Sequence, residues 1–168
     1  MSGPFRRGRD GRYRIRLDET ARTVLADLAR QLVPAVTTHD PMTKRLFPPA
    51  YPNPELAENE REYRGLVEDA LVAHHRGALE TLAASADAES LSEAEIHDWL
   101  SAVGSMRLVL GTRLDVSEDM SPPDSADPAA AEYALYEYLG GLQYLLVETL
   151  AEEIPDEGRP EGPFDPLC

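Results

Sequence analysis

The stretch SEAEIHDWLSAVGSMRLVLGTRLDV, residues 92–116, predicts the central helix of the fold. Ser92 and Glu95 have the S-x-x-E spacing of a capping box, in which each side chain accepts a hydrogen bond from the other residue's backbone N–H at a helix start. Apolar residues then recur at helical spacing along one face, namely Ile96, Trp99, Leu100, Val103 and Leu110. We therefore expect a buried helix that begins after Ser92 and ends at Gly111, because glycine often follows the last residue of a helix.

Arg107 lies on the apolar face of this helix, four residues after Val103 and eight after Trp99. A guanidinium removed from water needs a carboxylate or carbonyl acceptors. We therefore predict a structural ion pair between Arg107 and Asp115, or between Arg107 and an acid on the preceding long helix. Gly104 would allow a neighbouring helix to approach closely.

Three further helices are predicted from apolar residues at intervals of three and four. The first follows an N-cap at Asp18 and stops at Pro34. The second begins near Leu56–Asn59 and reaches about Ala84. Its predicted buried stripe is Tyr63, Leu66, Val67, Ala70, Leu71, Ala78, Leu79 and Leu82. The last helix lies within residues 129–154, with the stripe Tyr133, Tyr136, Leu139, Leu142, Leu146 and Leu150.

The N-terminal residues 1–17 form a basic arm with the pattern of β structure. Tyr13, Ile15 and Leu17 alternate with arginines, and Asp10-Gly11 is a turn signal. The arm is therefore expected to form a short hairpin or strand. Together these segments predict a mainly α fold, a helical bundle of about four main helices with a short N-terminal β-hairpin or strand.

The length of 168 residues suits one domain. We expect a single helical domain over residues 1–152, which includes the basic arm 1–17 and a rigid, extended, proline-rich connector 34–54. Residues 153–168 are acidic and rich in proline and glycine, and we expect this tail to be disordered.

Cysteine use and hydropathy bear on where the protein resides. No run of about 18 apolar residues is present. The basic N-terminus lacks the apolar segment of a secretory signal. Cys168 is the only cysteine among the 168 residues, so no intramolecular disulfide can form within them. These features predict a cytoplasmic protein with no membrane association.

The net charge of −15 is unevenly distributed. Residues 1–16 hold six arginines and one acid, a charge of +5, whereas the remaining residues hold 10 basic and 30 acidic side chains, a charge of −20. An acidic body repels nucleic-acid phosphates. Direct DNA binding is therefore expected only through the arginine arm, which is equally interpretable as a solvated, frayed terminus.

Chemistry-bearing motifs are missing from the sequence. Adjacent side chains on a helix diverge by about 100°, so His74 and His75 cannot share a metal, and we interpret His74 as a hydrogen-bonded core histidine. The acidic loop 115–127 lacks the spacing of a calcium loop. Phosphate-binding glycine motifs and nucleophile motifs are also absent. The sequence therefore predicts a non-enzyme with no cofactor and no metal.

The Gly140-Gly141 pair stands inside the last predicted helix, where each glycine costs about 1 kcal/mol relative to alanine. Close packing against another helix would offset that cost. We therefore predict an interface at Tyr133, Tyr136, Gly140 and Gly141. The facing helix belongs either to the same chain or to a second copy. In the second case the protein would be a homodimer, a helical homo-oligomeric adaptor or structural protein without a direct role in transcription.

Cys168 is the candidate redox residue. The acids around it raise the pKa of a thiol, which makes it a poor nucleophile. It can still oxidise slowly or pair with a cysteine of another chain, or it is an incidental exposed thiol.

Several segments together resemble one actinobacterial family. They are RLFPPAY (45–51), ENEREYRGLVEDAL (58–71), HDWLSAVGSMRLVLGTRLDV (97–116) and the closing helix rich in tyrosine and leucine. That family, long catalogued as a domain of unknown function, is described as the oxidative-stress transcriptional regulator AosR. The resemblance runs from about residue 4 to 152. It implies a helical cytoplasmic regulator in a redox-dependent partnership with an extracytoplasmic-function (ECF) sigma factor, which directs RNA polymerase to genes of thiol and amino-acid metabolism.

The switch ascribed to that family is an intramolecular disulfide, which Cys168 alone cannot form. Either the regulator works without the switch, or Cys168 acts between chains, or the function differs. The acidic body suits a protein partner, because sigma factors expose basic DNA-contacting helices. The expected function is therefore a non-enzymatic transcriptional regulator that contacts a sigma factor or RNA polymerase.

Overall fold

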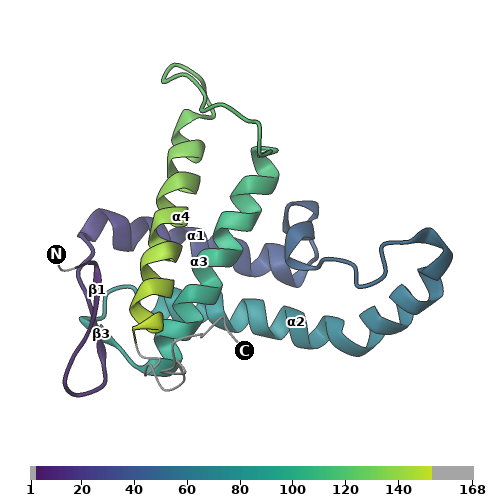
Figure 1. Cartoon of the computed structure of the whole chain (residues 1–168). Helices are drawn as coiled ribbons and strands as arrows, with labels where there is room; N and C mark the ends of the chain where they lie inside the picture. The colour runs from purple at the N-terminus through teal and green to yellow at the C-terminus, as the bar shows by residue number, and fades with distance from the viewer. Residues whose placement is uncertain (1–2, 153–168) are drawn as a thin grey trace, which may run out of the picture.

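The computed structural model describes residues 3–152 and has a mainly α fold. Its four main helices are α1 (Glu19–Thr37), α2 (Ala57–Ser85), α3 (Glu93–Arg113) and α4 (Ala130–Ala151). A small antiparallel sheet joins β1 (Phe5–Arg7), β2 (Tyr13–Ile15) and β3 (Ser90–Leu91) in that order. In Figure 1, α3 and α4 stand side by side, and α1 and α2 run across them. The predicted bundle of four helices with an N-terminal hairpin is confirmed.

The N-terminal hairpin forms as the alternation of its residues predicts. Phe5 lies opposite Ile15, and Tyr13 and Ile15 are buried while Arg14 between them is exposed. The third strand, β3, pairs with β2 through Leu91 opposite Tyr13. The sequence did not reveal β3, because a two-residue strand is too short to show an alternating pattern.

Helix α1 begins after Asp18, whose carboxylate accepts a hydrogen bond from the backbone of Ala21 at 2.7 Å. It continues through Pro34 to Thr37, so the prediction that Pro34 stops the helix is wrong. Pro34 is exposed and stands in the last turn, so the helix loses only the one backbone hydrogen bond that Pro34 cannot donate, at a position open to solvent. The helix ends instead at Thr37, and His39, which has a positive φ of 53°, follows the C-cap Thr38.

The proline-rich connector begins only after α1 has ended, and it contains two short 3₁₀ helices, η1 (Pro41–Leu46) and η2 (Pro54–Leu56). Leu46 and Phe47 are buried, so the first part of the connector is attached to the helical body. Arg64 of α2 donates a hydrogen bond to the carbonyl of Phe47 at 3.2 Å. The first part of the connector is therefore packed on the body, whereas residues 48–54 are exposed.

Helix α2 spans nearly the residues predicted for it, but only its second half is buried. Ala78, Leu79 and Leu82 belong to the core. The first half projects from the body in Figure 1, and Leu66 there is 79% exposed. The predicted buried stripe fails in this half because the helix extends beyond the elements that it packs against.

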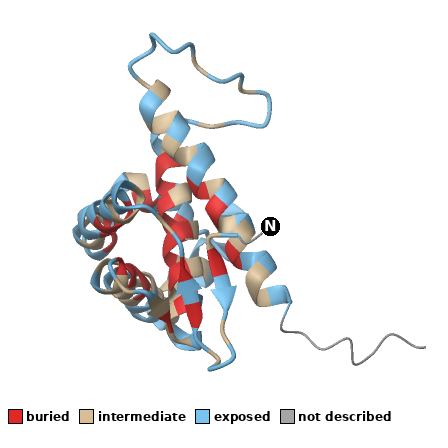
Figure 2. Ribbon diagram, turned by 90° about the vertical axis from the view of Figure 1, so that its left-hand side faces the viewer, coloured by how far each residue is buried: buried red, intermediate tan, exposed pale blue. Residues whose placement is uncertain are grey.

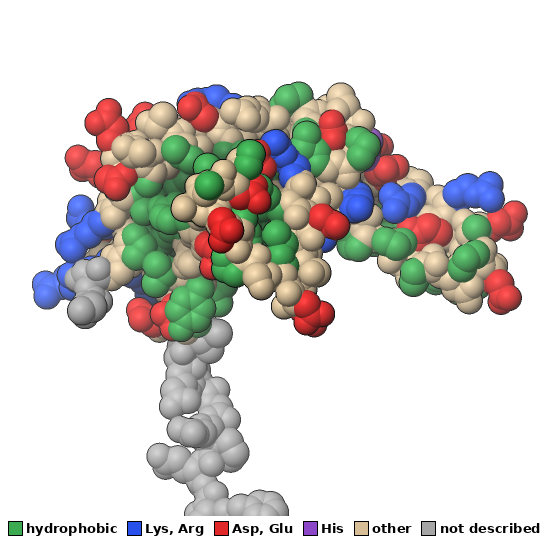
Figure 3. Space-filling view, turned by 90° about the horizontal axis from the view of Figure 1, so that it is seen from above, with side chains coloured by type: hydrophobic (Ala, Val, Ile, Leu, Met, Phe, Trp, Pro, Cys, Tyr) green, Lys and Arg blue, Asp and Glu red, His purple; other side chains and the backbone are tan. Residues whose placement is uncertain are grey.

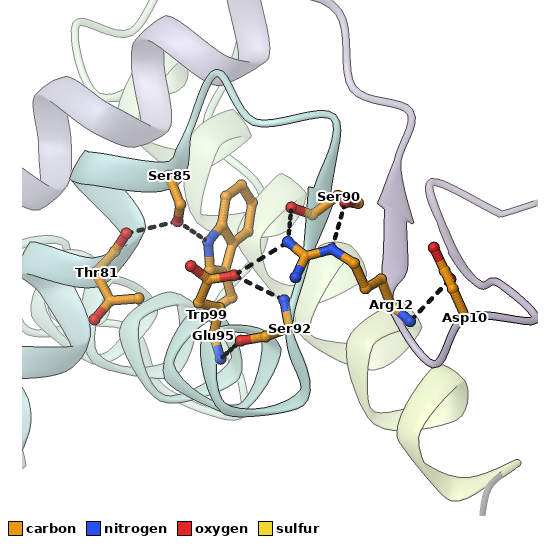
Figure 4. Close-up of polar contacts among 8 residues, drawn as sticks. All are labelled: Asp10, Arg12, Thr81, Ser85, Ser90, Ser92, Glu95 and Trp99. Atoms are coloured by element: carbon orange, nitrogen blue, oxygen red, sulfur yellow. Dashed lines mark hydrogen bonds and ion pairs between the residues drawn. The ribbon is translucent and has the colours of Figure 1, made fainter.

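The start of α3 carries the predicted capping box. Ser92 Oγ accepts a hydrogen bond from the Glu95 backbone at 3.2 Å, and Glu95 Oε2 accepts one from the Ser92 backbone at 2.7 Å. Arg12 reaches the same place from the hairpin, donating to the hydroxyl and the carbonyl of Ser90 at 2.9 and 3.1 Å. Its guanidinium is also 3.9 Å from Glu95, as Figure 4 shows.

Trp99 lies one turn further along α3 and is fully buried. Its indole N–H donates to Ser85 Oγ at 2.8 Å, and Ser85 Oγ donates to the Thr81 carbonyl at 2.6 Å (Figure 4). The ring of Phe5 meets the indole edge to face, with centroids 6.1 Å apart. Trp99 thus joins the hairpin, the end of α2 and the start of α3 in one core.

Arg22 of α1 binds backbone carbonyls next to the hairpin and after the end of α2. Its guanidinium donates to four backbone carbonyls at 2.7–3.2 Å, those of Ile15, Leu17, Ala86 and Ala88. Figure 2 shows buried positions on the inward faces of the helices and on the hairpin, with exposed positions outside. The core is therefore a single one to which the hairpin and all four helices contribute.

Candidate functional site

The segment 106–116 forms the second half of α3 and the turn that follows it. The helix does not end at Gly111, as predicted, but at Arg113. Asp115 takes the left-handed conformation with φ 50°, and the Val116 backbone donates to the Gly111 carbonyl at 2.9 Å, as in a Schellman motif. Gly111 is therefore free to serve packing rather than helix termination.

Helices α3 and α4 meet along a seam in which each glycine faces a larger side chain. A Cβ on Gly104 would lie 3.3 Å from Gln143 Nε2, and a Cβ on Gly111 would lie 3.2 Å from Tyr136 Cε2. In the pair between these two, the glycine belongs to α4 and the larger side chain to α3, since a Cβ on Gly140 would lie 3.2 Å from Arg107 Nε. Because the helices are antiparallel, positions 104, 107 and 111 face positions 143, 140 and 136.

Arg107 is the central residue of this seam. Its guanidinium carbon lies 5.1 Å from the centroid of the Tyr136 ring, within the range of a cation–π contact. Its Nε is buried and has no hydrogen-bond partner among the described residues. The predicted ion pair with Asp115 is not present there either, because Asp115 is exposed in the turn beyond the helix end. Stacking on Tyr136 takes the place of the expected carboxylate.

The four residues predicted as an interface divide between two faces of α4. Tyr136 and Gly140 serve the seam inside the chain. Tyr133 is partly buried, and its ring centroid is 6.1 Å from that of Tyr136. Gly141 is exposed, and a Cβ there would meet nothing within 4 Å. Packing within the chain therefore explains Gly140 but not Gly141.

Alanine substitutions at the two adjacent glycines are expected to have opposite effects. Gly141→Ala should raise the free energy of unfolding by about 1 kcal/mol, because alanine is the better helix former and the space is open. Gly140→Ala should lower it, because the new methyl group would displace Arg107 from Tyr136. Urea unfolding of both variants measures the difference. A stabilising Gly140→Ala would contradict the tight seam.

An acidic surface follows the seam along the chain. It comprises the loop 114–129 and the outward face of α4, which carries Glu137, Gly141, Tyr144 and Glu148. Residues 114–152 contain nine carboxylates and no lysine, arginine or histidine. Figure 3 looks onto the end of the molecule that bears this loop and shows acidic side chains around it, with positive ones at the hairpin edge and toward the projecting half of α2.

Apolar and aromatic side chains lie exposed among these acids. Tyr144 is 61% exposed and Val147 is 48% exposed. The Tyr144 hydroxyl donates to Glu148 Oε1 at 2.5 Å, and this hydrogen bond raises the pKa of Tyr144. The outward face of α4 thus carries negative charge together with exposed aromatic and apolar side chains that a partner could contact.

A groove of about 330 Å³ opens on the other side of α3, between that helix, α2, η1 and Gln143 of α4. His75 stands in its wall. A carbonyl can only accept, so His75 Nε2–H donates to the Leu46 carbonyl at 3.1 Å, and His75 Nδ1 accepts from Ser105 Oγ at 3.3 Å. Burial lowers the pKa of His75, assisted by His74 and opposed by the Leu46 bond. A neutral imidazole has one N–H donor and one acceptor nitrogen, which is what these two contacts require.

The hydrogen-bonded histidine is therefore the partly buried His75 and not His74, which is exposed. His75 follows Leu71 by four residues and precedes Ala78 by three, so it shares their face of α2. Within residues 3–152, no group of three or more His, Cys, Asp or Glu side chains is arranged to hold a metal ion.

Residues 2–150 match the family described as a domain of unknown function, DUF2017. The chain belongs to the DUF2017 family. The match includes all three strands and the whole of α1, α2 and α3, so the seam and most of the acidic surface lie inside the DUF2017 region. No curated protein and no solved structure matches the chain.

Two features of this DUF2017 protein complete the comparison with the sequence. No helix within the described part of the chain has the length and apolar character required to cross a bilayer. The predicted disordered tail and the candidate redox residue Cys168 lie outside the described residues and beyond the DUF2017 match.

Proposed function

We propose that this protein is a non-enzymatic transcriptional regulator that binds an ECF sigma factor or RNA polymerase through its acidic surface. The observation that carries the proposal is the run of residues 114–152, in which nine carboxylates occur without one basic side chain. Sigma factors expose basic, DNA-contacting helices, and complementary charge accelerates and orients such an encounter. The resemblance of the segments 45–51, 58–71 and 97–116 to the AosR family supports the same class of partner.

The outward face of α4 supplies the short-range contacts for this partner. Glu137, Gly141, Tyr144 and Glu148 follow one another at intervals of four, three and four residues, so they share one face. Tyrosine is enriched at protein interfaces, and a helical glycine without a neighbour in its own chain permits close approach of a partner helix. The charge provides attraction, and Tyr144 and Gly141 provide the contact area.

The test is the affinity of the full chain for a purified ECF sigma factor from the same host, measured by biolayer interferometry. Binding should weaken at least about tenfold between about 50 and 500 mM NaCl, because the attraction is electrostatic. Glu137→Lys/Glu148→Lys should weaken it by about tenfold or more at low salt. The matched control is Glu62→Lys/Asp69→Lys, which changes the net charge equally on the projecting half of α2 and should leave the affinity within about twofold.

Two results would overturn the proposal. One is the absence of binding to both the sigma factor and RNA polymerase at low salt. The other is an equal loss of affinity in the two charge-reversed variants, because net charge alone would then govern binding. Circular dichroism of each variant verifies that the helices are intact.

The part played by oxidation is decided separately with Cys168→Ser. Peroxide-dependent partner binding that is lost in this variant would assign control to a thiol that pairs between chains. Binding that is unaffected by peroxide in both proteins would mean that the regulator works without a thiol switch.

The second candidate function is that of a homo-oligomeric adaptor, favoured by the exposed apolar side chains of the projecting half of α2. Leu66 is the most exposed of these, and Leu56 and Tyr51 lie near the same end of the molecule. Light scattering of the purified chain separates the two functions, since a monomer that binds the sigma factor leaves no role for self-association.

A further inference from the structure

The groove between η1, α2 and α3 differs in charge from the rest of the surface. None of the described residues that line it is acidic, although the chain contains 31 aspartates and glutamates. The groove between η1 and the first half of α2 contains Asp40 and Glu68, and the groove between the hairpin and α4 contains Glu148 and Glu152. An acid-free groove in so acidic a protein is a place where an anion is not repelled.

The guanidinium of Arg45 lies in the lining of this groove, and that of Arg107, in the seam beside it, shares an aromatic neighbour with Arg45. Arg45 lines the groove, and its Nη1 lies 3.1 Å from the position of a Gly111 Cβ. Tyr136 Cε2 lies 3.2 Å from that same position, and Arg107 stacks on the Tyr136 ring. Gly111 and Gly140 make room for the two arginines, because a side chain at either glycine would occupy the space that they fill.

Neither of these arginines forms an ion pair with a described residue. Arg45 has only a long contact, 3.5 Å, with the carbonyl of Val116. Arg107 Nε is buried and unpartnered. Arg22, another partly buried arginine, shows the contrast, because its guanidinium donates to four carbonyls. Buried donors are almost always satisfied in proteins, so the unpartnered Nε of Arg107 is an exception, and no described carboxylate neutralises the charge of either arginine.

We propose that this groove binds a small organic anion, whose carboxylate or phosphate group is held by Arg45 and attracted by the second positive charge of Arg107 in the adjacent seam. Arg45 has only the long contact with the Val116 carbonyl, which leaves its N–H groups for an oxyanion. Leu46, Leu100 and Leu108 offer apolar contacts to the rest of the ligand, and Gln143 and Ser101 offer hydrogen bonds. The volume of about 330 Å³ suits a molecule of metabolite size.

This inference does not depend on the proposed protein partner. The residues that line the groove do not include Glu137, Gly141, Tyr144 or Glu148, and its ligand carries a charge opposite to that of the partner. An anion in the groove would neutralise two adjacent cations and draw η1, α3 and α4 together.

The test is a titration of the full ¹⁵N-labelled chain with inorganic phosphate and, separately, with acetate, at constant ionic strength maintained with sodium chloride. The Arg45 and Arg107 Nε–Hε signals should shift and saturate in the millimolar range, whereas those of Arg30 and Arg76, which pair with surface carboxylates, should not. Tighter binding of phosphate would identify phosphorylated ligands as the source of the anion, and tighter binding of acetate would identify carboxylates.

Arg45→Gln should weaken the binding that the Arg107 shift reports by about tenfold or more, since the charge-assisted contact of Arg45 is lost. Arg76→Gln is the matched control and should leave the binding unchanged. The proposal is overturned if neither anion gives a saturable shift, if chloride gives the same shift, or if Arg45→Gln binds as the wild type does.

Discussion

Replacing Trp99 with alanine is expected to lower the free energy of unfolding by about 4 kcal/mol, the largest single loss in this protein. The indole is fully buried, and it meets Phe5 of the hairpin and Ser85 at the end of α2. Truncation removes those contacts and leaves a cavity that three elements surround, so collapse around it is limited. Urea unfolding followed by far-ultraviolet circular dichroism measures the loss.

Two companion variants separate packing from hydrogen bonding at this site. Trp99→Phe keeps much of the apolar volume but loses the bond to Ser85 Oγ, and it should cost about 1–2 kcal/mol. Leu108→Ala, at a position that is 42% exposed on the same helix, should cost less than about 1 kcal/mol. A Trp99→Ala protein no less stable than Leu108→Ala would show that the indole is not the centre of the core.

Replacing Arg22 with alanine is expected to cost about 3 kcal/mol, since hydrogen bonds to a charged group are worth more than neutral ones and several acceptors lose their donor together. The guanidinium joins the carbonyls of Ile15 and Leu17 to those of Ala86 and Ala88. It therefore connects the hairpin and the start of α1 to the end of α2. The same urea unfolding assay applies.

Arg22→Lys shows whether the shape of the guanidinium or only its positive charge stabilises the fold. An ammonium group is a compact point charge and cannot reach all four carbonyls as the planar guanidinium does. Arg22→Lys should recover less than half of the loss. Arg30→Ala is the surface control, since Arg30 pairs only with Asp27 on the same exposed face, and it should change stability by less than about 0.5 kcal/mol. Equal stability of the Arg22→Ala and Arg30→Ala proteins would contradict the connecting role.

The comparison of Arg22 with Arg107 shows where sequence reasoning about charged residues reaches its limit. The position of Arg107 on the apolar face of α3 is correctly read from its spacing to Trp99 and Val103. The partner of Arg107 is not correctly predicted, because the residue that a side chain meets on another helix depends on the register of that second helix. Arg22 carries no sequence signal at all, since its four acceptors are backbone carbonyls contributed by segments up to 66 residues away.

Local signals were reliable at the starts of α1 and α3 and in the hairpin, but not at the helix ends predicted from Pro34 and Gly111. The capping box of Ser92 and Glu95, the N-cap at Asp18 and the alternation of Tyr13 and Ile15 are all present as predicted. Each of these patterns acts within a few residues, so the amino-acid sequence alone is enough to specify it. The four main helices and the hairpin were therefore determined by sequence.

Other features depend on what a segment meets after the chain has folded. Pro34 is accommodated in α1 because its missing hydrogen bond lies in an exposed last turn. Leu66 is exposed because α2 extends beyond the elements that pack against it. The antiparallel register of α3 and α4 sets Gly140 against Arg107 and leaves Gly141 outside. Helical periodicity shows which face of each helix is apolar, but only the packing of α3 on α4 decides which residues meet across that seam.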